Sequence, residues 1–299
     1  MSEPTSAESG RRRVTALDRA RDRYEAVSSR LPYKTKLAAV WVVIALALIG
    51  TFVALGLDTA FMREWAPFIL KGAVLTIFIS AGGILLAIPL ALMGALGRLS
   101  KNPIPNGIAS FYVSFFRGTP LIVQIFFIYT ALPQLASLGP EWMRPFFILD
   151  INLAGILALG INYGAYMTEI FRAGIQSVGH GQIEAAHALA MTHPQTMRRI
   201  VLPQALRVII PPTGNEFIAM LKDSALVGLA GTQELFYRAN SVGRFNFRSL
   251  ETLIMAAAVY WLLTSIFSIF QRRLERRMSK GYNREEAVET RLAHHEARL

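Results

Sequence analysis

Ionisable side chains interrupt the long apolar stretches of this 299-residue sequence. Five of them are the first candidates for a binding path: Arg117, Glu169, Glu216, Lys222 and Asp223. A charge within an apolar helix is costly, so it usually faces the protein interior or a water-filled cavity. A cation and an anion that face one cavity can hold a small zwitterion at both of its charges.

Glu169 is suited to bind an ammonium group and Arg117 to bind a carboxylate, with Gln124 and Asn162 as neutral hydrogen-bonding groups. Structural roles compete with each assignment. Glu169 and Arg172 are three residues apart and could simply pair on one helix. Arg117 could instead lie near a helix end and extend its guanidinium to water.

Lys222 and Asp223 are adjacent, so they do not face each other on a helix. We expect each of them to find a partner on another helix.

Several kinds of chemistry are missing from the sequence. It has no cysteine, no HExxH motif and no Gly-Lys dipeptide, so a phosphate-binding GxxxxGK[ST] loop is excluded. The five histidines are scattered. We therefore expect no catalytic residue, metal site or bound cofactor, and any ATP must be bound by another protein.

The apolar residues are gathered into long runs. Hydrophobic residues make up 53% of the chain and charged residues 17%, against about 25% charged in soluble domains. A helix of about 20 apolar residues crosses the hydrocarbon core of a bilayer. The sequence therefore predicts an all-α integral membrane protein with six transmembrane helices, at 37–57, 68–96, 108–132, 146–171, 208–230 and 252–270.

The net charge of +11 could suggest nucleic-acid binding, but its distribution argues against this. Basic residues outnumber acidic ones in four alternate segments, and the loops between them are nearly neutral; those segments are 1–36, 97–107, 172–207 and 271–299. The positive-inside rule then places both termini in the cytoplasm. One loop, with Arg238, Arg244 and Arg248, weakens the pattern. The first 36 residues are too long for the start of a cleaved signal peptide, so 37–57 is predicted to be retained.

Glycine and proline inside the runs predict kinks or breaks. They occur at Gly118-Thr119-Pro120, at Gly82-Gly83 with Pro89, and at Pro211-Pro212. Broken helices often line transport paths, although small residues also permit close helix packing.

The longest cytoplasmic loop, about 172–207, predicts a short helix–turn–helix. Gly179 and Gly181 break the preceding helix, and 182–191 has helical spacing of its apolar residues. Pro194 suits the first turn of a second helix, which Pro203 is expected to limit.

This loop resembles the EAA loop of permease subunits of ATP-binding-cassette (ABC) importers, through Glu184-Ala185-Ala186 followed by Ile200, Leu202 and Pro203. Three further stretches resemble the polar amino acid permeases of the histidine, glutamine and arginine type: Phe116-Arg117-Gly118-Thr119-Pro120, Gly164-Ala165-Tyr166-Met167-Thr168-Glu169, and Asn215-Glu216-Phe217 through Lys222-Asp223-Ser224. The family has glycine where this chain has Ala190, which we expect to be helical rather than strained.

The resemblance implies a five-helix ABC permease domain at 58–275 with a coupling loop at about 176–205. Outside it lie an extra transmembrane helix at 37–57 and cytoplasmic tails at 1–36 and 276–299. The implied location is the bacterial cytoplasmic (inner) membrane. The implied partners are ABC ATPase subunits, a second permease copy or a paralogue, an extracytoplasmic solute-binding protein, the lipid bilayer and an amino acid substrate.

The resemblance also implies that the loop docks on the ATPase subunit, through Ala185, Ala186 and Leu189 as an apolar patch. Ala190 follows the patch, and Glu184 either stabilises its own helix or pairs with a basic group of the partner.

Other functions stay open at this point. The chain could be an ABC permease for another small polar solute, or an ion-coupled secondary transporter, although it has no internal repeat and no obvious ion site. A membrane-embedded enzyme would need a catalytic or metal cluster, which the sequence does not offer.

Overall fold

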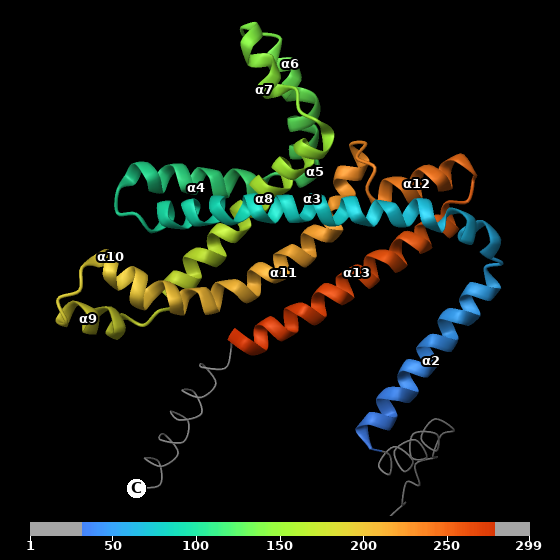
Figure 1. Ribbon diagram of the computed structural model, residues 1–299, viewed down its shortest axis with the longest axis horizontal. Helices are drawn as coiled ribbons and strands as arrows, with labels where there is room; N and C mark the ends of the chain where they lie inside the picture. Colours follow the sequence, from blue (N-terminus) through green and yellow to red (C-terminus); the bar gives the residue numbers. More distant parts are fainter. Residues whose placement is uncertain (1–31, 279–299) are drawn as a thin grey trace, which may run out of the picture. The chain divides into compact units, whose positions relative to one another are not determined.

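The computed structural model describes residues 32–278, and every regular element in that range is a helix (Figure 1). The chain forms two compact units, Met1–Asp58 and Thr59–Leu299. The predicted tails, 1–36 and 276–299, lie largely outside the described residues.

The first unit contains α2 (Tyr33–Ala54), which covers most of the helix predicted at 37–57. Its 22 residues span about 33 Å at 1.5 Å per residue, enough to cross the hydrocarbon core. No residue in its most apolar window is buried within the described chain. Packing within this unit therefore does not shield α2, and its apolar surface suits contact with lipid.

The second unit is built on α3 (Thr59–Leu99), a helix of 41 residues. Of the kink or break predicted at Gly82-Gly83 and Pro89, the break is absent, because α3 runs without interruption through all three residues. Gly83 lies directly against Met220, so the glycine serves close helix packing. A single proline removes only one backbone bond, which the packing along α3 outweighs.

Two helices, α8 (Ile151–Gln176) and α11 (Leu202–Leu229), pack on α3 and on each other. Their contact surface is the main core, which includes Ile79, Leu159, Met167, Ile209 and Met220. A smaller core joins α3 to α12 (Leu235–Phe245) and α13 (Ser249–Met278). Of the kink or break predicted at Pro211-Pro212, the break is likewise absent, because α11 continues through both prolines.

The run predicted at 108–132 is divided. It contains α4 (Pro103–Gly118) and α5 (Leu121–Phe126), and the chain bends by 105° between them. A π-helical turn (Phe127–Ala131), α6 (Leu132–Ala136), a 3₁₀ turn (Glu141–Met143) and α7 (Arg144–Phe147) follow. The break predicted at Gly118-Thr119-Pro120 is therefore confirmed.

The cytoplasmic loop predicted at 172–207 contains α9 (His180–Ala188) and α10 (His193–Thr196). Pro194 lies in the first turn of α10, as predicted, behind a capping box of Thr192 and Gln195. Pro203 does not limit this helix, because a π-helical turn (Met197–Val201) joins α10 to α11. The π turn shifts the hydrogen-bond register just before Pro203, where a proline lacks the usual N–H.

Three described helices are long and apolar enough to cross a membrane: α2, α3 and α13. A fourth span results if α4 and Leu121–Ala136 count as one bent helix. The helical membrane architecture is thus confirmed, and the count of six spans stays a prediction. The helices α8 and α11 are not among these spans, and they carry most of the candidate residues.

Candidate functional site

The break between α4 and α5 is the local feature that shapes the site. Thr119 is extended, with φ −112° and ψ 141°, because a residue before proline avoids the helical region. Pro120 then precedes α5 as its extended N-cap residue, where its missing N–H is not needed. Arg117 consequently lies in the last turn of α4, beside the break.

Two amide side chains satisfy the backbone groups that the break releases. The Gln124 amide nitrogen donates to the carbonyl oxygens of Phe116 at 3.0 Å and Thr119 at 3.1 Å. The Asn162 amide nitrogen donates to the Phe116 carbonyl at 3.0 Å and to the Gln124 amide oxygen at 3.1 Å. A free carbonyl at membrane depth costs several kcal/mol, so these contacts stabilise the broken helix. Both residues were predicted as neutral substrate contacts, and their present partners are protein groups.

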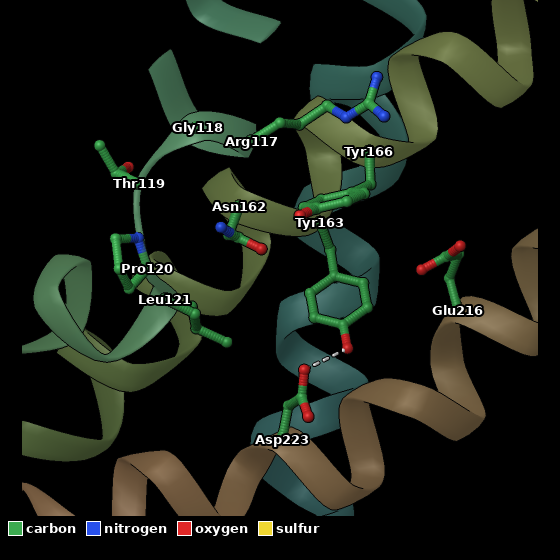
Figure 2. Close-up of a pocket in the computed structure, with 10 residues that line it drawn as sticks. All are labelled: Arg117, Gly118, Thr119, Pro120, Leu121, Asn162, Tyr163, Tyr166, Glu216 and Asp223. Atoms are coloured by element: carbon green, nitrogen blue, oxygen red, sulfur yellow. Dashed lines mark hydrogen bonds between the residues drawn. The ribbon is translucent and has the colours of Figure 1, made fainter. Parts of the chain in front are cut away.

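A cavity of about 400 Å³ lies beside the break (Figure 2). Its lining comes from α4, the break, α5, α8 and α11, namely Arg117, Gly118, Thr119, Pro120, Leu121, Asn162, Tyr163, Tyr166, Glu216 and Asp223. Small-molecule sites usually measure about 300–1,000 Å³. The cavity is therefore large enough for one small polar solute.

Opposite charges occupy different sides of this cavity. Arg117 extends over Tyr166, with its guanidinium carbon 5.1 Å from the ring centroid. Glu216 and Asp223 rise from α11 on another side (Figure 2). They are seven residues apart, which is about two helical turns, so both face the same way. The Tyr163 hydroxyl donates to Asp223 at 2.8 Å and orients that carboxylate.

Tyr163 and Tyr166 are cavity residues that the sequence reasoning missed. They stand one turn apart on α8 and contact Asp223 and Arg117 respectively. Their spacing places them on one face of the helix, next to Asn162, which was predicted. Tyr166 lies within the stretch Gly164–Glu169 and Tyr163 directly before it, so their helical spacing beside Asn162 is the sequence signal for both.

Glu169 lies near the cavity but is not among its lining residues. Its carboxylate pairs with Arg172 at 2.7 Å and with Arg98 of α3 at 3.4 Å. The pairing of Glu169 with Arg172, one of the two alternatives, is therefore present. The second arginine could not be inferred from local spacing, because α3 and α8 meet only in the tertiary structure.

Lys222 and Asp223 behave differently although they are neighbours on α11. Asp223 finds its partner on another helix, as predicted, through Tyr163. Lys222 is exposed and does not line the cavity. A step of one residue turns a helix by about 100°, which explains the separation.

The segment between α8 and α11 presents a short exposed helix. Glu184 and Ala185 are exposed on α9, Leu189 is 78% exposed, and Ala186 is buried against the rest of the loop. The predicted apolar patch is thus divided, with Ala185 and Leu189 outside and Ala186 inside.

The expectation that Ala190 is helical is wrong. Its φ is +57°, in the left-handed region. The Met191 amide donates to the Ala186 carbonyl at 3.1 Å and the Ala190 amide to the His187 carbonyl at 2.9 Å. These two bonds form a Schellman motif, in which the left-handed residue is usually glycine. The helix end requires this conformation, and alanine adopts it despite its β-carbon.

Within residues 32–278, no group of three or more histidine, aspartate or glutamate side chains is placed to hold a metal ion.

Comparison with known proteins gives consistent matches. Residues 83–280 match the family described as "Binding-protein-dependent transport system inner membrane component". The chain is 40% identical over 226 residues to the "Probable amino-acid permease protein YxeN" of Bacillus subtilis (strain 168), covering 76% of this chain and 98% of that protein.

The "Arginine transport system permease protein ArgU" of Corynebacterium glutamicum is 39% identical over 235 residues, covering 77% of this chain and 74% of that protein. A solved structure titled "Crystal structure of an amino acid ABC transporter with histidines" superposes with a TM-score of 0.67 at 37% identity. The match covers 74% of this chain and 99% of that one.

Proposed function

The chain belongs to the family of binding-protein-dependent transport system inner membrane components, and on that premise we propose that it is the permease subunit of an ABC importer for polar amino acids. In this role it is a transporter component and not an enzyme, and it forms the path of the solute through the bacterial cytoplasmic membrane.

The cavity beside the broken helix carries the proposal. A free amino acid has a carboxylate and an ammonium group on the same carbon. Arg117 supplies a cation and Glu216 and Asp223 supply anions within one cavity of about 400 Å³. Charge-assisted hydrogen bonds of this kind are about twice as strong as neutral ones. We assign the carboxylate to Arg117 and the ammonium to the two acids of α11, with the Asn162 amide oxygen as a neutral acceptor, because its amide nitrogen already donates to Phe116 and Gln124.

Three further predicted residues are not assigned a direct contact with the solute in this proposal. Glu169 already pairs with two arginines, so an ammonium group would have to displace them. Lys222 is exposed and does not line the cavity. Gln124 acts indirectly, because it holds the break that positions Arg117.

The loop of α9 and α10 is the proposed coupling element. Exposed Ala185 and Leu189 with Glu184 beside them suit docking on an ATPase subunit, and Ala190 completes the helix end. The helical path from His193 through the π turn to Leu229 gives movement of this loop a direct route to Glu216 and Asp223.

We also propose the six-helix topology, with 37–57 as the extra helix and 58–275 as the permease domain. The 26 residues of α8 and 28 of α11 each exceed the length that a bilayer requires. Glu169 pairs with arginines, and Glu216 and Asp223 line the cavity, which makes these three charges tolerable at membrane depth. Both termini and the coupling loop are then cytoplasmic, and the tails 1–36 and 276–299 flank the domain.

The proposed partners are two ABC ATPase subunits that bind ATP, a second permease copy or a paralogue, an extracytoplasmic solute-binding protein and the lipid bilayer. This chain requires no cofactor of its own in the proposal, and nucleic acid has no part in it.

The test is transport by the purified complex. We would isolate the chain with its copurifying ATPase, reconstitute both with the solute-binding protein in liposomes, and measure ATP-dependent uptake across the amino acids. Arg117→Gln and Asp223→Asn should each raise the half-saturating solute concentration about tenfold or more, the equivalent of one charged hydrogen bond. Lys222→Gln is the matched control and should change it little.

Uptake by the isolated chain in an ion gradient, without any ATPase, would overturn the proposal in favour of a secondary transporter. A complex stimulated by another small polar solute but by no amino acid would keep the ABC permease and overturn the substrate class.

A further inference from the structure

Glu234 is a fully buried carboxylate away from the cavity. It stands directly before the first residue of α12, and α12 lies on the side of the unit away from α9 and α10 (Figure 1). Its side chain is 0% exposed, which is rare for glutamate without a special role. Neither the coupling loop nor the solute cavity uses it.

Neutral hydrogen-bond donors from three helices converge on this carboxylate. Tyr260 of α13 donates its hydroxyl at 2.6 Å and Thr76 of α3 at 3.1 Å. The Tyr237 backbone amide of α12 donates at 2.7 Å. Among the ion pairs of residues 32–278, none involves Glu234. The carboxyl group is therefore satisfied entirely by hydrogen bonds that tie α3, α12 and α13 together.

The end of α11 is pressed against the same group. Gly228, in the last turn of α11, has no room for a β-carbon because the Glu234 carboxylate lies against it. Gly72 of α3 likewise has no room, since a β-carbon there would lie 2.7 Å from the Leu235 backbone. Thr76 also accepts a hydrogen bond from the Leu235 amide at 3.3 Å. The junction between α11 and α12 is thus fixed by both packing and hydrogen bonds.

Along the chain, α11 runs from the coupling loop, past Glu216 and Asp223, to this junction. If α11 were a rigid helix free at both ends, it would translate as a whole when one end moved. If α11 is held at one end, it rotates about that end, so Glu216 and Asp223 change position relative to the other helices. Arg117 belongs to α4 and does not move with α11.

We propose that Glu234 is a positioning residue that anchors the far end of α11, so that movement of the coupling loop displaces Glu216 and Asp223 relative to Arg117. The inference rests on the proposed function and adds to it a residue through which movement of the coupling loop displaces the acids of the cavity. The anchor acts through hydrogen-bond geometry, and no counter-ion takes part.

The experiment compares amino acid uptake per ATP hydrolysed in the reconstituted complex. Glu234→Leu keeps a similar volume but removes all acceptors, and it should lower the ratio about a hundredfold, because three hydrogen bonds are lost together. Glu234→Gln keeps one acceptor and replaces the other with a donor to which the hydroxyls can adjust, so it should stay within about twofold of the wild-type ratio.

Two further variants isolate the hydrogen bonds. Tyr260→Phe removes one donor from the cluster and should lower the ratio about fivefold, by the same reckoning for one hydrogen bond. Thr264→Val is its matched control on α13, because the Thr264 hydroxyl bonds only to carbonyls of its own helix among the described contacts. It should leave the ratio unchanged.

A merely structural role would reduce the amount of assembled complex and leave uptake per ATP intact, and that result overturns the inference. If Glu234→Leu does not assemble, Tyr260→Phe decides, and a wild-type ratio in that variant refutes the anchor. A wild-type complex without solute-stimulated ATP hydrolysis would instead refute the proposed function, and this inference with it.

Discussion

Replacing Ala190 with glycine should stabilise the end of α9. Ala190 has a φ of +57°, and the two hydrogen bonds of the Schellman motif, from Ala190 to His187 and from Met191 to Ala186, depend on that conformation. The left-handed conformation destabilises alanine by about 1–2 kcal/mol, because its β-carbon approaches the next carbonyl oxygen. Glycine has no β-carbon and lacks this strain.

The net stabilisation is smaller than the strain that glycine relieves, because glycine also increases the conformational entropy of the unfolded chain. That entropic cost is about 0.4–1 kcal/mol. The net effect of Ala190→Gly should therefore be a stabilisation of about 0.5–1 kcal/mol. Since 1.4 kcal/mol corresponds to a factor of ten, the local opening equilibrium should shift by about two- to fivefold.

Hydrogen–deuterium exchange of the purified permease measures this equilibrium at the amides concerned. The protection factors of the residue 190 and Met191 amides, each corrected for the intrinsic exchange rate of the new sequence, should rise about two- to fivefold. Ala185→Gly is the matched control in the same helix, where glycine costs about 1 kcal/mol, so protection should fall.

Equal or lower protection in Ala190→Gly would refute the strain argument. It would mean that position 190 is helical in solution, or that neighbouring contacts offset the strain of the left-handed alanine.

Three further predictions concern the site and the loop. Gln124→Leu should lower the free energy of unfolding by about 2 kcal/mol, because the Phe116 and Thr119 carbonyls each lose a donor. Thr130→Val is the control, since its hydroxyl donates to the nearby Phe126 carbonyl, and equal thermal midpoints for the two variants would contradict the prediction. Glu169→Gln should lower the free energy of unfolding by ~2 kcal/mol, because it weakens the pairs with Arg98 and Arg172, and should leave the half-saturating solute concentration unchanged. A large rise in that concentration would instead show that Glu169 contacts the substrate. Glu184→Lys should insert and assemble normally yet lower solute-stimulated ATP hydrolysis, and unchanged hydrolysis in reconstituted complexes would remove Glu184 from the coupling role.

The break in the helical run shows how far local sequence reasoning extends. Gly118-Thr119-Pro120 predicts the interruption because proline restricts the residue before it and lacks an N–H. The same reasoning failed at Pro89, Pro203 and Pro211-Pro212. There the helix is held by packing on other helices or by a π turn, and local preferences of this size are outweighed by such contacts.

The sequence by itself determined the membrane class, the basic segments and the stretches that resemble amino acid permeases. Each of these follows from composition or from residues close together in the chain. It also supplied the charges of the cavity, because charges within apolar runs are conspicuous.

Only the tertiary structure decided which of those charges meet. Glu169 pairs with Arg98 because α3 packs on α8, and Asp223 meets Tyr163 because α11 crosses the same helix. Glu234 has the same explanation, since its partners Thr76 and Tyr260 are 158 and 26 residues away. Contacts of this kind depend on how the helices pack, and neither the hydropathy of a segment nor the spacing along it contains that information.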